Sequence, residues 1–166
     1  MNTYNSQQLI GVEIGVYKGE NAIEMLANCP ALFLFLVDNY DRITKDAAGT
    51  YPYTSEEMKL VKAEAIQLLQ SFNNRYMFIF KSSNEAVKEF NDLFFDYIYI
   101  DGDHRYEQIK QDLDFWYPKL KLGGIFAGHD FNEGGVNKAV NEWFINNKLQ
   151  YFTEIPSYDW WSIKNE

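Results

Sequence analysis

Short apolar runs alternate along the chain with segments in which apolar residues recur at helical spacing. Apolar runs bounded by turn residues predict strands at residues 9–14, 31–37, 76–80, 97–100 and 125–127. Helical periodicity predicts helices at residues 20–27, 54–70, 84–90, 106–116 and 136–145. Strictly alternating strands and helices are typical of a mostly parallel sheet with helices on both faces.

The segments between these elements carry turn signals. Residues 39–53 predict an irregular loop, and the pair Gly123-Gly124 predicts the end of the fourth helical segment before the next strand begins. Residues 151–155 and 160–163 flank Pro156-Ser157-Tyr158-Asp159 and predict a closing β-hairpin.

Length and composition are those of a globular domain. We expect one domain over residues 1–166, because no linker or repeat divides the chain. No apolar run approaches the roughly 18 residues of a membrane span, and the polar start of the chain has no secretory signal. Cys29 is the only cysteine, so an internal disulfide is excluded. These features predict a cytoplasmic protein.

The net charge of −9 bears on the class of partner. An acidic chain repels phosphate backbones, so we expect no nucleic-acid partner and no anionic membrane surface. A small anionic cofactor held by backbone amides stays compatible with this charge.

The polar residues with the most chemistry follow two strands. Asp101, Asp103 and His104 follow the strand at 97–100, and His129 and Asp130 follow the run that begins at residue 125. Both histidines of the chain are in this set. The carboxyl ends of parallel strands are where open α/β sheets bind ligands, so we expect these side chains to converge on one crevice.

A second motif follows the first strand. Gly15 and Gly19 bound the turn before the first helix, and Asp38 ends the second strand, where a carboxylate can bind the hydroxyls of a ribose. The spacing differs from the G-x-G-x-x-G of dinucleotide sites, which favours a cofactor with a ribose but no pyrophosphate. A nucleotide- or NAD-binding Rossmann-type protein and a non-catalytic domain of the same fold stay as alternatives.

These motifs together resemble the class I S-adenosylmethionine-dependent methyltransferases. The run Asp101-Gly102-Asp103-His104-Arg105-Tyr106-Glu107, with Gly123-Gly124 leading to His129-Asp130, is most similar to the small-molecule and sugar O-methyltransferases of the macrocin and cephalosporin-biosynthesis type. The resemblance implies a Rossmann-like α/β fold with seven strands, mostly parallel, and an antiparallel edge strand supplied by residues 160–163. It implies S-adenosylmethionine as cofactor and a small-molecule or sugar acceptor.

The resemblance also implies roles for single residues on the cofactor side. Glu13, Gly15 and Gly19 would form the loop around the methionine part of the cofactor. Asp38 would bind the ribose diol.

Further cofactor contacts would come from the next two strand ends. Ser82 and Ser83 occupy the place beside adenine, where the family often has Gly-Asp-Ser and this chain has Lys81-Ser82-Ser83. Asp101 would line the cofactor crevice, with His104 next to it.

The resemblance leaves the chemistry at the acceptor open. A metal site of Asp101, His129 and Asp130 would suit Mg²⁺ through its carboxylates, although an imidazole ligand favours a transition metal. Without a metal, His129 or His104 would be the general base, with Asp130 beside it. We expect Asp103 to cap the helix that follows.

The acceptor itself is not defined by the sequence. Five aromatic residues are candidates for its wall, namely Tyr40, Tyr51, Tyr53, Phe131 and Trp160. A lid over the acceptor would come from residues 39–53, from residues 131–135 or from a second subunit of a homo-oligomer.

Overall fold

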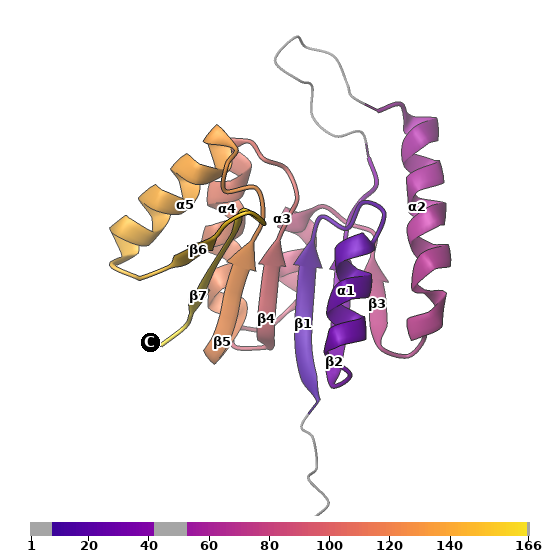
Figure 1. The fold of residues 1–166 in the computed structure, drawn as a ribbon, viewed down its shortest axis with the longest axis horizontal. Coiled ribbons are helices and arrows are strands. Elements are labelled where there is room, and N and C mark those ends of the chain that lie inside the picture. The colour runs from indigo at the N-terminus through magenta and orange to yellow at the C-terminus, as the bar shows by residue number, and fades with distance from the viewer. Residues whose placement is uncertain (1–7, 42–52, 166) are drawn as a thin grey trace, which may run out of the picture.

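The computed structural model describes residues 8–41 and 53–165. A seven-stranded sheet runs through it in the order β3-β2-β1-β4-β5-β7-β6 (Figure 1). The strands are β1 (Leu9–Ile14), β2 (Leu32–Val37), β3 (Tyr76–Ile79), β4 (Phe95–Ile100), β5 (Leu120–Gly128), β6 (Phe152–Glu154) and β7 (Asp159–Ile163). Strands β1 to β5 pair in parallel, and β7 pairs antiparallel with both of its neighbours. The predicted Rossmann-like α/β fold is confirmed.

Helices connect the strands as the periodicity predicted. They are α1 (Glu20–Asn28), α2 (Ser55–Leu69), α3 (Ser83–Ala86), α4 (Tyr106–Trp116) and α5 (Gly134–Asn147). The start of α2 is fixed by a capping box: the Thr54 hydroxyl accepts the Glu57 N–H, and the Glu57 carboxylate accepts the Thr54 N–H. No helix in the described ranges is long and apolar enough to cross a membrane.

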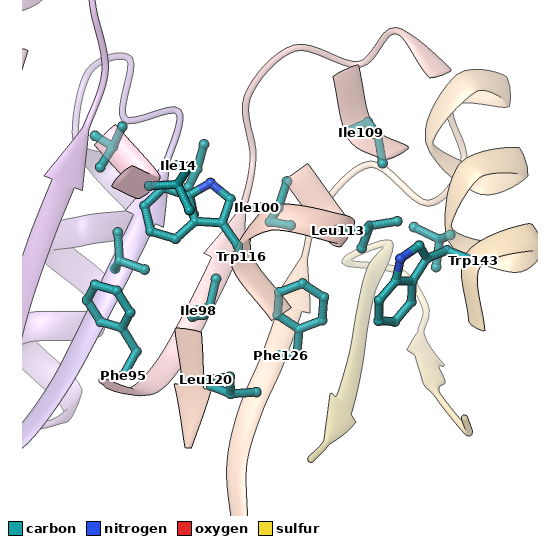
Figure 2. Close-up of a cluster of buried hydrophobic side chains, with 14 of the residues drawn as sticks. Ile14, Phe95, Ile98, Ile100, Ile109, Leu113, Trp116, Leu120, Phe126 and Trp143 are labelled. Atoms are coloured by element: carbon teal, nitrogen blue, oxygen red, sulfur yellow. The ribbon is translucent and has the colours of Figure 1, made fainter. Parts of the chain in front are cut away.

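The two faces of the sheet are covered by different helices, with α1 and α4 on opposite sides (Figure 1). One face packs Leu34 and Leu36 of β2 against Leu26 of α1. The other face holds the larger core, in which side chains of β1, β4 and β5 pack against the helices that follow. Figure 2 shows Ile14, Phe95, Ile98, Ile100, Ile109, Leu113, Trp116, Leu120, Phe126 and Trp143 in this cluster.

Burial of this kind supplies most of the favourable free energy of folding, at roughly 25 cal/mol per Å² of apolar surface. It also fixes the strands whose ends form the candidate site. Because Ile14, Ile100 and Phe126 are almost completely buried on one face, the residues just beyond these strands have little freedom to shift register.

Three features differ from the sequence prediction. Strand β5 begins at Leu120 rather than at residue 125, because Gly123 adopts φ +77° and lets the strand continue through an irregularity in its pairing with β4. The helix predicted at 84–90 is divided into α3 and the 3-10 helix Val87–Glu89. Strand β7 lies one place in from the edge, which β6 occupies. Most of the loop predicted at 39–53 lies outside the described residues.

Candidate cofactor and acceptor site

Three adjacent strands end at the same edge of the sheet. Strand β4 lies between β1 and β5, so Gly15, Asp101 and His129, which directly follow these strands, lie next to one another. The backbone continues the ladder beyond the strands: the Asp101 N–H donates to the Ile14 carbonyl at 2.7 Å, and the His129 N–H donates to the Ile100 carbonyl at 3.1 Å. The acidic and imidazole side chains therefore start from rigid backbone.

Asp130 links the two histidines of the chain. His104 Nε2 lies 2.9 Å from Asp130 Oδ2, and His129 Nδ1 lies 3.1 Å from Asp130 Oδ1. Asp101 Oδ1 lies 3.8 Å from His129 Nδ1. Asp130 itself has φ +55°, a left-handed conformation that aspartate tolerates better than most residues. This turn directs its carboxylate toward both imidazoles.

The ligand atoms of Asp101, His104 and Asp130 lie within 4.8 Å of one another. Two carboxylates and one imidazole are a donor set that suits a divalent cation with remaining positions for water or substrate. The set differs from the predicted one in its histidine, since His104 takes the place of His129. His129 borders the same carboxylates, so the geometry brings together four of the five residues that the sequence singled out, all but Asp103.

Burial and charge shift the proton affinities of this cluster. Burial raises the pKa of Asp101 to about 6, although the nearby His129 lowers it. Burial lowers the pKa of His129, but Asp101 and Asp130 raise it more, and the pKa ends above its ordinary value. The protonation of Asp101 and that of His129 therefore depend on one another.

Gly15 lets the first loop approach the end of β4. It has φ +87°, and a Cβ at this position would lie 2.1 Å from the Asp101 carbonyl oxygen. Any side chain here would force the two strand ends apart. The glycine predicted from the sequence is thus required for a loop that runs directly against Asp101.

Glu13 precedes this loop and is 1% exposed. The Asn21 side-chain amide donates to Glu13 Oε1 at 2.8 Å, but Glu13 Oε2 has no hydrogen-bond partner. Burial raises the pKa of the Glu13 carboxyl well above its usual range. A buried acceptor without a partner costs free energy, so this oxygen is suited to a donor brought by a ligand.

Asp38 has a structural role that the sequence did not indicate. Its Oδ2 accepts the N–H groups of Val16 at 2.9 Å and Tyr17 at 3.0 Å, and its Oδ1 accepts the Tyr40 N–H at 2.7 Å. The carboxylate thus joins the glycine loop to the end of β2. It also lines a cavity of about 340 Å³, and its contact with a ribose stays a prediction.

The serines after β3 line the same cavity and are already engaged. Ser82 forms the capping box of α3 with Glu85. The Ser83 hydroxyl accepts a hydrogen bond from Trp116 Nε1 at 2.8 Å and donates to Asp112. Their contact with adenine stays a prediction.

Asp103 does not cap α4 as the sequence suggested. Arg105 is the N-cap residue and makes no side-chain capping bond. Asp103 instead accepts the Arg105 N–H at 3.0 Å and pairs with its guanidinium at 2.6 Å. The Asp103 carboxylate therefore bonds to the backbone before the helix and not to an N–H of its first turn.

A second cavity of about 780 Å³ adjoins the first and contains the candidate acceptor chemistry. Gly15, Asp101 and Gly102 line both cavities, whereas Glu13, His104, His129 and Asp130 line the larger one alone. Asp159, at the start of β7, lines the larger cavity but was not among the site residues predicted from the sequence. Its carboxylate accepts a hydrogen bond from the Tyr99 hydroxyl at 2.6 Å. No motif marks Asp159, because only the hairpin brings it to the site.

Of the predicted aromatic wall, Tyr53 lines the larger cavity, where its hydroxyl lies 3.1 Å from that of Tyr17. Trp160 is completely buried in the core, so its assignment to the wall was wrong. Phe131 and Tyr40 are not among the lining residues of the larger cavity. Tyr51 lies outside the described residues.

A family model described as a methyltransferase domain matches residues 12–131, which include both strand-end motifs. The chain belongs to this methyltransferase family. Membership implies S-adenosylmethionine as the methyl donor, and the orphan oxygen of Glu13 and the close approach allowed by Gly15 fit that donor. The comparison with curated proteins finds no match.

Solved structures share the fold of this methyltransferase domain at low sequence identity. The O-methyltransferase NovP is 15% identical with a TM-score of 0.74, and the alignment covers 98% of this chain and 74% of NovP. A Staphylococcus aureus protein provisionally named as a caffeoyl-CoA O-methyltransferase is 18% identical with a TM-score of 0.67, covering 95% of this chain and 76% of that one.

The fold alone does not select methyl transfer. Spermidine synthase from Thermotoga maritima is also similar, with 18% identity, a TM-score of 0.59, and 96% of this chain and 55% of the synthase covered. The family match, rather than the fold, therefore identifies the chain as a methyltransferase domain.

Proposed function

We propose that the protein transfers a methyl group from S-adenosylmethionine to a hydroxyl oxygen of a small molecule or sugar. The observation that carries this proposal is the position of the Asp101, His104, His129 and Asp130 cluster in the larger cavity, beside the glycine loop. The similarity to two structures named as O-methyltransferases supports the choice of oxygen.

The cofactor side is formed by groups that complement S-adenosylmethionine. Glu13 Oε2 is a buried acceptor for the ammonium of the methionine part. Asp38 would bind the ribose hydroxyls, and Ser82 and Ser83, which line the same smaller cavity, would face the adenine. The backbone at Gly15, which lines both cavities, would lie beside the sulfonium.

On the acceptor side, the cluster positions and deprotonates the hydroxyl. Transfer forms a carbon–oxygen bond as the carbon–sulfur bond of the sulfonium breaks, which leaves S-adenosylhomocysteine and requires the hydroxyl to lose its proton. Alignment of the oxygen with the methyl group is a large part of the catalysis. We assign the removal of the proton to the carboxylates and imidazoles of the cluster, which line the larger cavity.

A divalent cation such as Mg²⁺ fits this arrangement. Asp101 and Asp130 would hold it, with His104 as the third ligand by the geometry and His129 as the third ligand by the resemblance. A bound cation would lower the pKa of the acceptor hydroxyl. In the metal-free form of the proposal, His129 or His104 takes the proton directly.

Binding separates this proposal from the Rossmann-type alternative. Calorimetry with S-adenosylhomocysteine and with NAD should show saturable binding of the first and none of the second. Substitution of the exposed Glu107 on α4, which lines neither cavity, by glutamine is the control and should leave binding unchanged. Binding of NAD alone would contradict the proposal.

Turnover tests the oxygen chemistry. Release of S-adenosylhomocysteine is measured with a panel of sugars and phenols, with and without a chelator. Loss of turnover with the chelator and its recovery with a divalent ion would support the metal form. Turnover that survives the chelator but is lost in His129→Ala or His104→Ala would support the metal-free form. Full activity of Asp130→Ala, His129→Ala and His104→Ala with the chelator present would contradict both.

A further inference from the structure

The smaller cavity contains a buried carboxylate that the proposed chemistry does not use. Asp112 lies on α4 and lines this cavity together with Asp38, Ser83, Asn84 and Gln108. It is 1% exposed. A carboxylate so deeply buried is unusual unless its charge is matched by hydrogen bonds or by a ligand.

One oxygen of Asp112 is satisfied and the other is not. The Ser83 hydroxyl and the Gln108 side-chain amide, the latter at 3.1 Å, both donate to Oδ1. Asp112 Oδ2 is buried and has no partner. A purely structural carboxylate would be expected to engage both oxygens, because a buried unsatisfied acceptor destabilises the folded chain.

The surroundings hold this carboxylate in one orientation. Trp116 Nε1 donates to the Ser83 hydroxyl at 2.8 Å, which leaves the hydroxyl proton directed at Asp112 Oδ1. Trp116 is itself fully buried, so the chain Trp116–Ser83–Asp112 is anchored in the core. Consequently Oδ2 is a fixed acceptor rather than one that can turn to find another donor.

The rest of the cavity indicates what the donor belongs to. Ile14, Val37 and Met58 supply apolar lining, and Asp38 supplies the acceptor for sugar hydroxyls. A ligand that matches this lining has a polar sugar, a flat apolar body and an N–H donor, which describes a nucleoside with an exocyclic amine. The volume of about 340 Å³ lies in the range of small-molecule sites.

We propose that Asp112 recognises the exocyclic amine of the aminopurine by accepting its hydrogen bond on Oδ2. The half-buried Gln108 donates to Asn84 at 3.4 Å as well as to Asp112, and the first of these bonds is long. In this proposal the Gln108 amide would give up its long bond to Asn84 to admit the amine. Burial raises the pKa of Asp112 to about 6, so near neutral pH the carboxylate is mainly ionised and able to accept.

This inference rests on the proposed function, because it assigns a residue to the adenine of the same cofactor. It also gives Ser83 a role other than the adenine contact expected from the sequence. The Ser83 hydroxyl orients Asp112, and the Asp112 carboxylate contacts the base. Asp112 is then a specificity residue at the end of the cofactor opposite to the reacting methyl group.

The test is a calorimetric comparison of two ligands that differ by one group. S-adenosylhomocysteine is compared with its analogue in which hydrogen replaces the 6-amino group of the purine. The wild-type protein should bind the amino form roughly tenfold to a hundredfold more tightly, as for a hydrogen bond to a charged group. In Asp112→Asn this preference should largely disappear, because the substituted amide directs either a donor or a weaker acceptor at the amine.

Asp114→Asn is the matched control, since Asp114 lies on the same helix, is exposed and lines neither cavity. It should keep the full preference. Equal binding of the two ligands by the wild-type protein would overturn the inference. This comparison needs no variant, so it remains decisive even if Asp112→Asn fails to fold. A preference retained in a folded Asp112→Asn, checked by thermal melting, would overturn it as well. If neither ligand binds the wild-type protein, the proposed function fails instead.

Discussion

The Nε2 atom of His104 lies 2.9 Å from Asp130 Oδ2, a contact that joins the ends of β4 and β5. The contact makes His104 part of the acid and imidazole cluster. The ligand atoms of Asp101, His104 and Asp130 lie within 4.8 Å of one another, so we expect His104 rather than His129 to be the third ligand of a cation bound there.

We therefore predict that His104→Ala weakens the binding of Mn²⁺ at least tenfold, by removing a ligand, whereas His129→Ala weakens it less. Calorimetric titration of each purified variant with Mn²⁺ measures this difference. The reverse order, with His129→Ala the more damaging change, would favour the ligand set that the resemblance implies.

Asp38→Ala should weaken binding of S-adenosylhomocysteine by about 1–3 kcal/mol, because ribose hydroxyls lose their acceptor. The same substitution also frees the amides of Val16 and Tyr17. A 2′-deoxy analogue separates the two effects, since only the ribose contact depends on its missing hydroxyl. If the wild-type protein and Asp38→Ala discriminate equally between ligand and analogue, Asp38 does not bind the ribose.

Gly15→Ala should abolish cofactor binding, because the added Cβ would meet the Asp101 carbonyl at 2.1 Å in a backbone conformation that alanine rarely adopts. Gly134→Ala is the control, since a Cβ there has no atom within 4 Å. Calorimetry and thermal melting of both variants measure the effect. Normal binding by Gly15→Ala would show that the two strand ends can separate freely.

Binding of S-adenosylhomocysteine should release protons through Glu13. Burial raises the pKa of Glu13 in the free protein, and the ammonium of the ligand should lower it again by favouring the carboxylate. Calorimetry in buffers of different ionisation enthalpy measures the protons released. Glu13→Gln should bind more weakly and without this release, and an unchanged release would assign it to another group.

Asp112→Asn should change how stability depends on pH. The pKa of Asp112 is raised from 3.8 to about 6 in the folded protein, so the folded state holds the proton more tightly than the unfolded chain. Wild-type stability is therefore lost as the pH rises through this range, by up to about 3 kcal/mol.

The free energy of unfolding in urea, measured from about pH 4 to about pH 7, tests this expectation. The variant should gain stability relative to the wild-type protein as the pH rises, because asparagine does not ionise. A constant difference between the two proteins would mean that Asp112 has an ordinary pKa.

The order of elements was predictable because apolar runs and helical spacing are local properties of the chain. The meeting of Asp101 with His129 followed from the rule that parallel strands end at one edge. The longer β5 was not predictable, because the pair Gly123-Gly124 signals a turn as readily as a strand irregularity.

The missed parts of the site depend on tertiary contacts. Asp159 reaches the larger cavity because β7 pairs with β5. The sequence of a hairpin does not predict which strand of the sheet it will pair with. Asp112 lies at helical spacing with the buried residues Ile109, Leu113 and Trp116, so its place on the inner face of α4 could have been predicted. Its hydrogen bond with Ser83 depends on how α4 packs beside α3, which the sequence does not show.

Asp38 accepts three backbone N–H groups, two of them from the glycine loop, and on the proposed function it would also accept a ribose hydroxyl. Three hydrogen bonds leave room on the two carboxylate oxygens for a fourth, so a nucleoside bound there would share this side chain with Val16 and Tyr17. Tyr17 also lines the acceptor cavity, where its hydroxyl meets that of Tyr53. Binding of the donor at Asp38 would therefore bear on a residue that also lines the acceptor cavity, and we expect an ordered reaction in which the methyl donor binds first.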